Sequence, residues 1–254
     1  MVFGRSLAIA RQDWRVLRRD PFPVIVLVVL PLLLIPFLKP AFRLAFVAEH
    51  VRDTAGVEQA VPAMDVTFAF FLVGISSMAF FREHAWRTWD RLRASPATTY
   101  EIIVGKITLP LLQAAGQFIL VFGLGGTLLG LTVHGSWADL AIVGAAYSLY
   151  LVAMGLTVTA ICKTYVQANA VTNVGALFLA GLGGALVPHA FLPGWAQSIS
   201  PAVPSYWAIR GYRAAILGHG DVLPSVVVLL AFAGVFILVA ALCFRLDGTK
   251  VAWA

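Results

Sequence analysis

The sequence predicts an all-α, polytopic membrane protein with six transmembrane helices, an amino-terminal interfacial amphipathic helix and an external re-entrant helical hairpin before the last span. Three observations support this fold class. Hydrophobic residues make up 60% of the 254 residues and charged residues only 12%, whereas about a quarter of a soluble domain is charged. Apolar runs recur along the chain, and each is near the roughly 20 residues that a membrane span needs. Lys and Arg concentrate in alternate connecting segments.

Residues 1–20 are predicted to form the interfacial helix. One helical face collects the apolar side chains Phe3, Leu7, Ala10, Trp14 and Leu17. We expect Trp14, Arg11 and Arg15 to anchor this helix, with the indole at the headgroup boundary and the arginines against anionic lipid. A solvated helix that packs on a partner is the alternative. Arginines are spread through the whole segment, so no cleavable signal peptide is expected.

The whole chain is interpreted as one transmembrane domain. Its six spans are predicted at residues 22–38, 63–81, 107–131, 137–162, 168–187 and 223–244. Segment 39–62 is expected to be external. Prolines and aromatic residues break up segment 188–222, which is too irregular for one span and too apolar for a free loop, so short re-entrant helices are expected there. Glycines within the spans are attributed to close helix packing.

The distribution of basic residues predicts the orientation. The amino-terminal segment, residues 82–106, Lys163 and the carboxy-terminal tail together hold thirteen Lys and Arg residues, and the two segments predicted outside hold five. Because cytoplasmic loops are enriched in Lys and Arg, both termini are expected in the cytoplasm. The two cysteines fall near predicted cytoplasmic helix ends and are expected to stay reduced.

Several kinds of chemistry are not supported by the sequence. The pair Gly105-Lys106 lacks the preceding glycine of a phosphate-binding loop, because Tyr100 stands there, and no H-E-x-x-H zinc motif occurs. The carboxylates are expected outside the membrane core, with Asp65 and Asp139 only at helix ends, which disfavours ion-coupled transport and an intramembrane enzyme. The basic balance is explained by membrane orientation, and no nucleic-acid partner is expected. A passive pore, a scaffold or a permease driven by another subunit remain.

Two pairs of amides lie inside predicted spans. Gln113 with Gln117, and Asn169 with Asn173, are four residues apart, so each pair shares a helical face. They are expected either to bond between helices or to line a translocation route.

The segment 82–106 is the longest charged interruption between two spans. Residues 82–94 are predicted to form an amphipathic helix in which Glu83 pairs with Arg87, Ser95-Pro96 ends it, and Thr98 with Glu101 form a capping box that starts the next helix. A helix of this composition suits docking into a partner's groove. A lipid-facing interfacial helix is the alternative. The residues predicted to contact the partner are Glu83, Trp86, Arg87, Trp89, Asp90, Arg91 and Arg93.

The run REHAWRTWDRLRASP at 82–96, followed by Glu101-Ile102-Ile103 and Gly105-Lys106, resembles the first cytoplasmic loop of ABC-2 type ABC transporter permeases of the type V exporter fold, in particular their bacterial drug-export branch. Residues Leu192 to Trp195, with Ser200-Pro201, Pro204 and Trp207, are similar to the external hairpin of the same family. Arg87 stands where many members have glycine.

The resemblance implies a permease subunit that is not itself an enzyme. It would pair with a second permease chain as a homodimer or heterodimer, and each chain would dock a cytoplasmic ABC ATPase that carries ATP and Mg²⁺, with no cofactor in this chain. Residues 82–106 would be the coupling loop. The expected cargo is a hydrophobic or amphiphilic drug, antibiotic or lipid-like molecule, and the expected location is the bacterial plasma membrane. A non-transporting scaffold or sensor that recruits a cytoplasmic partner is the alternative.

Overall fold

The computed structural model describes residues 2–19, 22–48, 55–86, 88, 94–95 and 98–243, and this part of the chain is helical with no strand. The predicted all-α fold is therefore confirmed. The helices are α1 (Val2–Leu17), α2 (Phe22–Ala48), α3 (Val57–Ala69), α4 (Phe71–Ala85), α6 (Thr99–Leu129), α7 (Trp137–Ile161), α8 (Tyr165–Leu182), η1 (His189–Phe191), α9 (Gly194–Ile199), η2 (Ser200–Ala202), α10 (Pro204–Leu217) and α11 (Leu223–Cys243).

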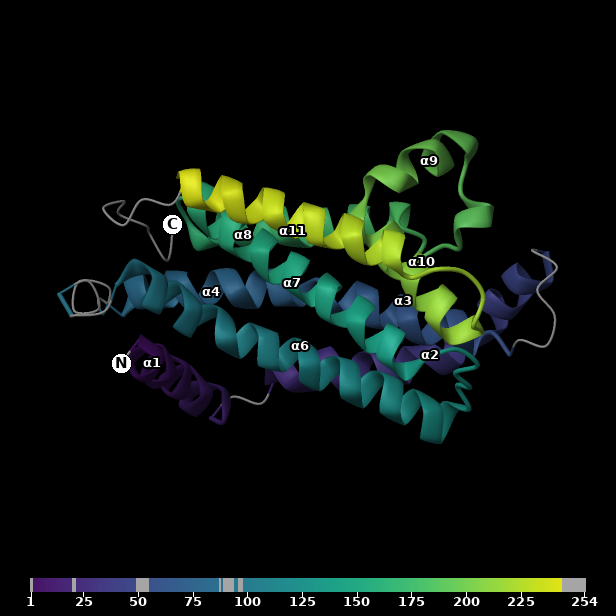
Figure 1. Ribbon diagram of the computed structural model, residues 1–254, viewed down its shortest axis with the longest axis horizontal. Helices are drawn as coiled ribbons and strands as arrows, with labels where there is room; N and C mark the ends of the chain where they lie inside the picture. The colour runs from purple at the N-terminus through teal and green to yellow at the C-terminus, as the bar shows by residue number, and fades with distance from the viewer. Residues whose placement is uncertain are drawn as a thin grey trace.

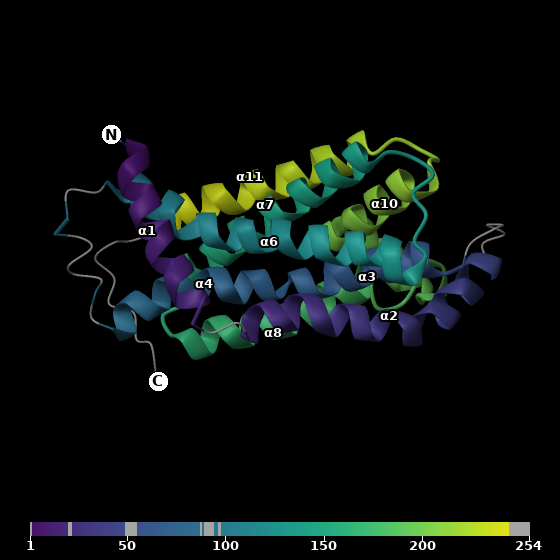
Figure 2. The same ribbon diagram turned by 90° about the horizontal axis from the view of Figure 1, so that it is seen from below.

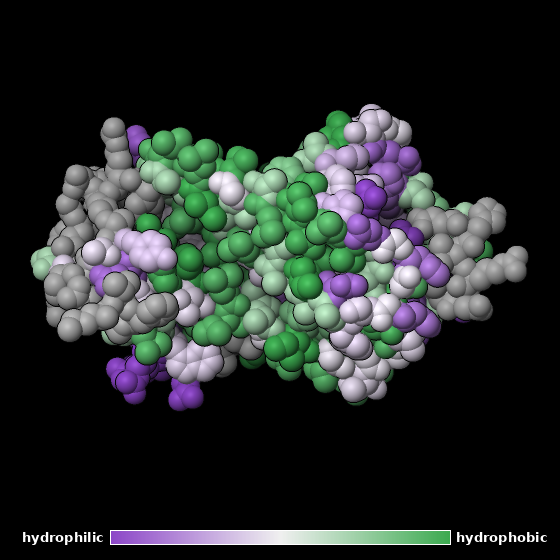
Figure 3. Space-filling model, viewed as in Figure 1, coloured by the Kyte–Doolittle hydropathy of each residue, from purple (hydrophilic) through white to green (hydrophobic). Residues whose placement is uncertain are grey.

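The long helices run side by side along the molecule (Figure 1). α1 and the carboxy-terminal end of α11 lie at one end, called here the α1 end, and α9 and α10 lie at the other, called the α10 end. α1 crosses the α1 end steeply and does not run along the bundle (Figure 2). On the face shown in Figure 3, hydrophobic residues form a band across the middle of the molecule, and more polar residues gather toward both ends. This distribution is the one expected of a multi-pass membrane protein.

Helix α7 forms the centre of the bundle, because its neighbours α4, α6, α10 and α11 all pack on it. Tyr147, Tyr150 and Leu151 are buried along α7. Gly155 lets α4 approach, since a Cβ there would lie 2.7 Å from Ser76 Cβ. The hydrophobic effect does not drive helices together in lipid, so van der Waals packing at such close contacts stabilises their association instead.

Within the described residues, five helices are long and apolar enough to cross a membrane: Ile25–Ala48, Val57–Glu83, Tyr100–Leu129, Trp137–Ile161 and Leu223–Cys243. The second of these combines α3 and α4. Helix α8 has only 18 residues and carries Gln167, Asn169 and Asn173, which make it more polar than the others. The six-span count and the re-entrant character of the segment before α11 therefore stay predictions, as does the single-domain assignment.

The first predicted span was too short. α2 continues to Ala48, with Pro31, Pro36 and Pro40 inside the helix, whereas the sequence suggested a stop at residue 38 and an external segment at 39–62. The extension forms because α2 packs on α3 and buries Phe42 and Phe46, and this packing outweighs the helix-breaking tendency of proline. Gly56, at a φ of 86°, then brings the chain close to the backbone of Lys39 before α3 begins.

Candidate functional site

A buried network of charged side chains joins α1, α4 and α6 at the α1 end. Lys106 Nζ donates to Glu83 Oε1 at 2.5 Å and to Asp13 Oδ1 at 3.1 Å, and Arg82 Nη2 donates to the same Asp13 oxygen at 2.7 Å. Lys106 and Asp13 are each 2% exposed. Glu83 also accepts a short hydrogen bond from Thr88. In this network the negative charges of Asp13 and Glu83 are matched by the positive charges of Arg82 and Lys106, and buried charges need such partners.

The local sequence explains why α6 begins beside this network. Thr98 Oγ1 accepts from the Glu101 backbone N–H at 3.2 Å, and the Glu101 carboxylate accepts from the Thr98 backbone N–H at 2.7 Å. The predicted capping box is therefore confirmed. Ser6 of α1 donates to the Glu101 carbonyl at 3.0 Å. Gly105 allows close packing, because a Cβ there would lie 2.8 Å from Ile9 Cβ.

The structure places two of the residues predicted to contact a partner. Trp86 is 54% exposed, with the Arg82 guanidinium 5.2 Å from its ring centroid. Glu83 is 5% exposed and bonds to Lys106 and Thr88, so it does not lie on an exposed docking face. The expected pair of Glu83 with Arg87 lies outside the described residues. α4 ends at Ala85. The other predicted contacts lie outside the described residues: Arg87, Trp89, Asp90, Arg91 and Arg93.

A cavity of about 480 Å³ lies next to the charge network, between α1, α2, α4, α6 and α8. Most of its lining is apolar and includes Leu27, Phe71 and Ile75. Asp13 and Arg82 line it as well. An apolar cleft with a few polar groups is typical of a site for an organic ligand.

Three of the four amides predicted to line a route reach this cavity: Gln113 from α6, and Asn169 and Asn173 from α8. Asn173 Nδ2 donates to Asn169 Oδ1 at 3.1 Å. A second cavity of about 190 Å³ shares Asn173 and Phe71 and continues between the end of α3 and α8 to Leu186. Gln117 is not in either lining, because its amide donates to the backbone oxygen of Asp65 at 3.1 Å.

Unsatisfied polar atoms gather at the larger cavity. Asp13 Oδ2, Arg82 Nε and Gln113 Oε1 are buried and have no hydrogen-bond partner among the described residues. Such atoms are uncommon in folded proteins because each costs about 1–3 kcal/mol. Two acceptors and one donor beside apolar walls could bind an amphiphile whose head group both donates and accepts hydrogen bonds.

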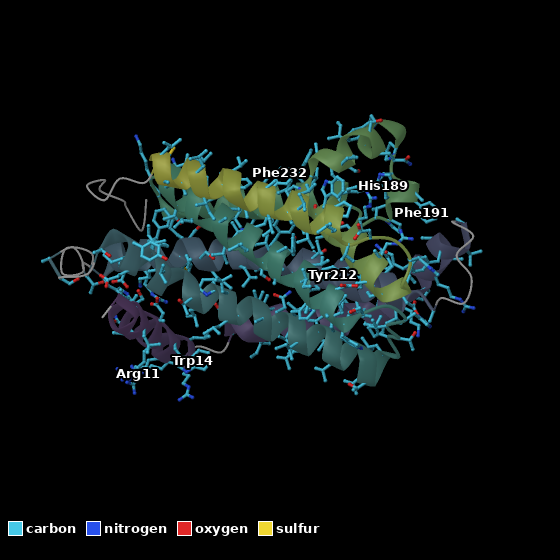
Figure 4. The ribbon with its side chains drawn as sticks, viewed as in Figure 1. Arg11, Trp14, His189, Phe191, Tyr212 and Phe232 are labelled. Carbon is cyan, nitrogen blue, oxygen red and sulfur yellow. The ribbon has the colours of Figure 1, made fainter. Side chains whose placement is uncertain are left out.

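Asp65 does not lie at the end of a helix, where it is expected from the sequence. α3 begins at Val57, so Asp65 lies more than two turns inside it and is 4% exposed. Tyr212 Oη donates to Asp65 Oδ2 at 3.0 Å and thereby joins α10 to α3 (Figure 4). The sequence placed the helix start too late. A carboxylate and a tyrosine 147 residues apart give no local signal of their pairing.

The predicted interfacial anchors point away from the bundle. Arg11, Trp14 and Arg15 are exposed on α1, and Figure 4 shows Arg11 and Trp14 on the side of α1 away from the other helices. The face of α1 toward the bundle carries Ser6 and Asp13. Anchoring in lipid stays a prediction. No group of three His, Cys, Asp or Glu side chains that could hold a metal occurs within the described part of the chain.

Comparison with known proteins identifies the family. The family described as ABC-2 type transporter matches residues 6–217. The chain is 30% identical over 138 residues to a probable multidrug ABC transporter permease, YbhR, of Escherichia coli strain K12, covering 54% of this chain and 37% of that protein. It is 27% identical over 178 residues to the inner membrane transport permease YhhJ of the same strain, covering 67% of this chain and 47% of that protein.

The chain thus spans less than half the length of these curated relatives. No solved structure matches it significantly. The family match includes the charge network, both cavities and α10, and it agrees with the resemblance carried by residues 82–106. The chain belongs to the ABC-2 type transporter family.

Proposed function

We propose that the chain is the transmembrane permease subunit of an ATP-driven exporter that moves hydrophobic or amphiphilic molecules out of the cytoplasm or the inner leaflet. The observation that carries this proposal is the buried charge network, which ties the ends of α4 and α6 to α1 directly beside segment 86–98. ATP and Mg²⁺ would bind to a separate ATPase subunit docked on that segment. The α1 end is then the cytoplasmic end.

The network gives the coupling segment a stiff connection to the membrane helices. Lys106 and Glu83 are joined at 2.5 Å across α4 and α6, which are the two helices that the segment connects. Closure of an ATPase pair would displace the segment, and a buried ion pair would transmit the displacement because separating its charges would leave each of them buried without compensation. Glu83 then acts inside the permease, while Trp86 and the charged residues after it contact the ATPase.

The cargo route would start at the cavity beside the network. Its apolar walls suit the apolar part of an amphiphile, and Gln113, Asn169 and Asn173 offer hydrogen bonds along it. The smaller cavity continues this path between the end of α3 and α8 toward the α10 end. The larger cavity lies next to α1, so cargo would enter from the cytoplasmic side.

A second permease chain would complete the route. Asn169 and Asn173 are exposed on α8 among exposed apolar residues such as Val174 and Leu177. Exposed amides inside a membrane are costly against lipid and favour association between helices. We therefore place the dimer contact on α8. A single cysteine at position 173 in a Cys162→Ser, Cys243→Ser background should cross-link between chains, and one at position 235 on α11 should not.

The experiment that tests coupling uses the permease reconstituted with the ATPase encoded beside it. Reversing the charges of Arg87, Asp90 and Arg91 should reduce assembly and ATP hydrolysis by at least tenfold. Lys163→Glu, at an exposed lysine of the same end, is the matched control and should retain both activities. Unchanged assembly and hydrolysis in the triple variant would refute the coupling role. Assembly with no cargo-dependent hydrolysis in the unaltered complex would favour the scaffold function instead.

A further inference from the structure

A carboxyl group and two tyrosines meet inside the helix bundle, where α3 packs against α10 and α7 (Figure 1). Asp65 of α3 is 4% exposed, and Tyr147 of α7 and Tyr212 of α10 are each 1% exposed. Asp65 belongs to the membrane-length helical stretch Val57–Glu83. The proposed transport function uses none of these three side chains.

The partners of the Asp65 carboxyl group are neutral. Tyr212 Oη donates to Asp65 Oδ2 at 3.0 Å, and Gln117 Nε2 is a weaker donor at 3.4 Å from Asp65 Oδ1. Within the described residues, no Lys or Arg forms an ion pair with Asp65. An ionised carboxylate at this position would therefore have no counter-charge.

The polar side chains of α6 and α7 bond mainly to the backbone of α3. The Gln117 amide donates to the backbone oxygen of Asp65 at 3.1 Å, and Tyr147 Oη donates to that of Val66 at 3.1 Å. The carboxyl group is left with Tyr212 as its one strong donor. Carboxylates that stay ionised inside proteins accept two or three such hydrogen bonds or lie beside a cation.

The charged residues of the helices packed on α3 lie in other contacts. α8 carries no charged residue. Arg210 of α10 lies over the ring of Trp207. Arg213 lies over the ring of Phe46 on α2. Glu58, two turns before Asp65, accepts the Ala55 backbone N–H at 3.1 Å. The other charged residues are Lys39 and Arg43 of α2, whose backbone lies beside Gly56, and Arg82, Glu83, Glu101 and Lys106 at the α1 end.

Burial without a counter-charge decides the protonation state of such a group. A carboxyl group in this environment takes up a proton, because burying the ionised form costs far more free energy. Ionisable side chains within membrane spans are rare, face the bundle interior and are typical of proton-binding sites. We propose that Asp65 is a proton-binding site, which the packing of α10 on α3 holds as the neutral acid. Movement of α10 away from α3 hydrates the carboxyl group and releases the proton, so this helix contact is sensitive to pH.

A cavity of about 470 Å³ at the α10 end, called here the α10 cavity, connects this site with water. Its lining includes Gln59 of α3 and Ile209 of α10. Ile209 lies three residues before Tyr212, so the cavity reaches within one helical turn of the buried pair. The proton of Asp65 therefore exchanges with the α10 side of the membrane.

The pH dependence of unfolding tests whether folding retains a proton at Asp65. The full chain is unfolded in mixed detergent micelles between pH 5 and pH 7. An exposed aspartate has a pKa of about 3.9, so the unfolded chain is ionised at this position while the folded chain is not, and stability falls as the pH rises. Relative to Asp65→Asn, the unfolding equilibrium constant of the unaltered chain should rise about tenfold for each pH unit. A ratio of the two constants that does not change with pH overturns the proposal.

Infrared spectroscopy in a detergent without carbonyl groups observes the acid directly. Unaltered protein at neutral pH should show the carbonyl band of a neutral carboxylic acid, and Asp65→Asn should lose it. Tyr212→Phe should keep the band and shift it to higher frequency, because the acid loses a hydrogen bond. Asp221→Asn is the matched control, because Asp221 is exposed, and it should change neither the band nor the pH dependence.

Two variants keep this test decisive if one of them does not fold. Asn has the shape of the neutral acid, so Asp65→Asn should fold; if it does not, the frequency shift in Tyr212→Phe assigns the band. Absence of the band from unaltered protein at neutral pH, or an identical band in the folded variants at Asp65 and Tyr212, overturns the proposal. Neither measurement involves an ATPase or cargo, so the result is independent of the proposed transport function.

Discussion

Replacing Lys106 with methionine tests the buried charge network most directly. The ammonium is 2% exposed and bonds to Glu83 at 2.5 Å and to Asp13 at 3.1 Å. Removing one partner of a buried ion pair costs about 3–5 kcal/mol, because the remaining charge is buried without compensation. Asp13 keeps Arg82 at 2.7 Å, and Glu83 keeps Thr88. We therefore expect a loss near the lower limit, about 3 kcal/mol of unfolding free energy.

Reversible unfolding in mixed detergent micelles, followed by tryptophan fluorescence, measures this loss. Lys163→Met removes an exposed lysine at the same end and should change stability by no more than about 0.5 kcal/mol. Glu83→Gln combined with Lys106→Met should show a coupling energy of about 0.5–3 kcal/mol, because the two residues share a contact. A loss below about 1 kcal/mol, the range of an exposed ion pair, would refute the assignment of a buried network.

Three further predictions concern other contacts and use the same unfolding assay. Tyr212→Phe should lower the free energy of unfolding by about 1–3 kcal/mol, because it leaves an oxygen of the buried Asp65 carboxyl group unpaired, and it should raise hydrogen exchange in α10. Tyr150→Phe is the control and should cost less, because the Tyr150 hydroxyl donates to the Met154 thioether. Thr98→Ala should cost about 1 kcal/mol and raise exchange in the first turn of α6, and unchanged exchange there would contradict the capping role. Gly155→Ala should lower the free energy of unfolding by about 1–3 kcal/mol, because the added methyl group overpacks the contact with α4. Gly116→Ala adds a methyl group in open space and should raise the free energy of unfolding by about 0.5–1 kcal/mol. Equal effects of the two substitutions would contradict the packing explanation.

The charge network gives the amino-terminal helix a structural role besides the membrane anchoring that the sequence predicts for it. α1 turns Leu7 and Trp14 outward, with 68% and 42% of their surface exposed, and turns Asp13 inward to Lys106. One helix thus exposes apolar side chains on one side and contacts the ends of α4 and α6 on the other. A change in how α1 lies on the membrane would reach the segment between α4 and α6 through the same ion pairs.

Local patterns in the sequence were sufficient for several features. The apolar runs identify the membrane helices because spanning a bilayer sets a minimum length. The capping box at Thr98 was predictable because both of its bonds lie within four residues. The end of α2 was not predictable, because Lys39 and Pro40 indicate the end of a helix. Only the packing of α2 on α3, with Phe42 buried, shows that the helix continues.

The sequence by itself determined the fold class, the family resemblance and the position of the charged segment after α4, because each depends on composition or on residues close together in the chain. The tertiary structure decided which charges meet. Asp13 and Lys106 are 93 residues apart, and Asp65 and Tyr212 are 147 apart. Helical periodicity shows which residues share a face, but the partner of that face depends on how the helices pack. For this reason the charge network and the α10 cavity became visible only in three dimensions.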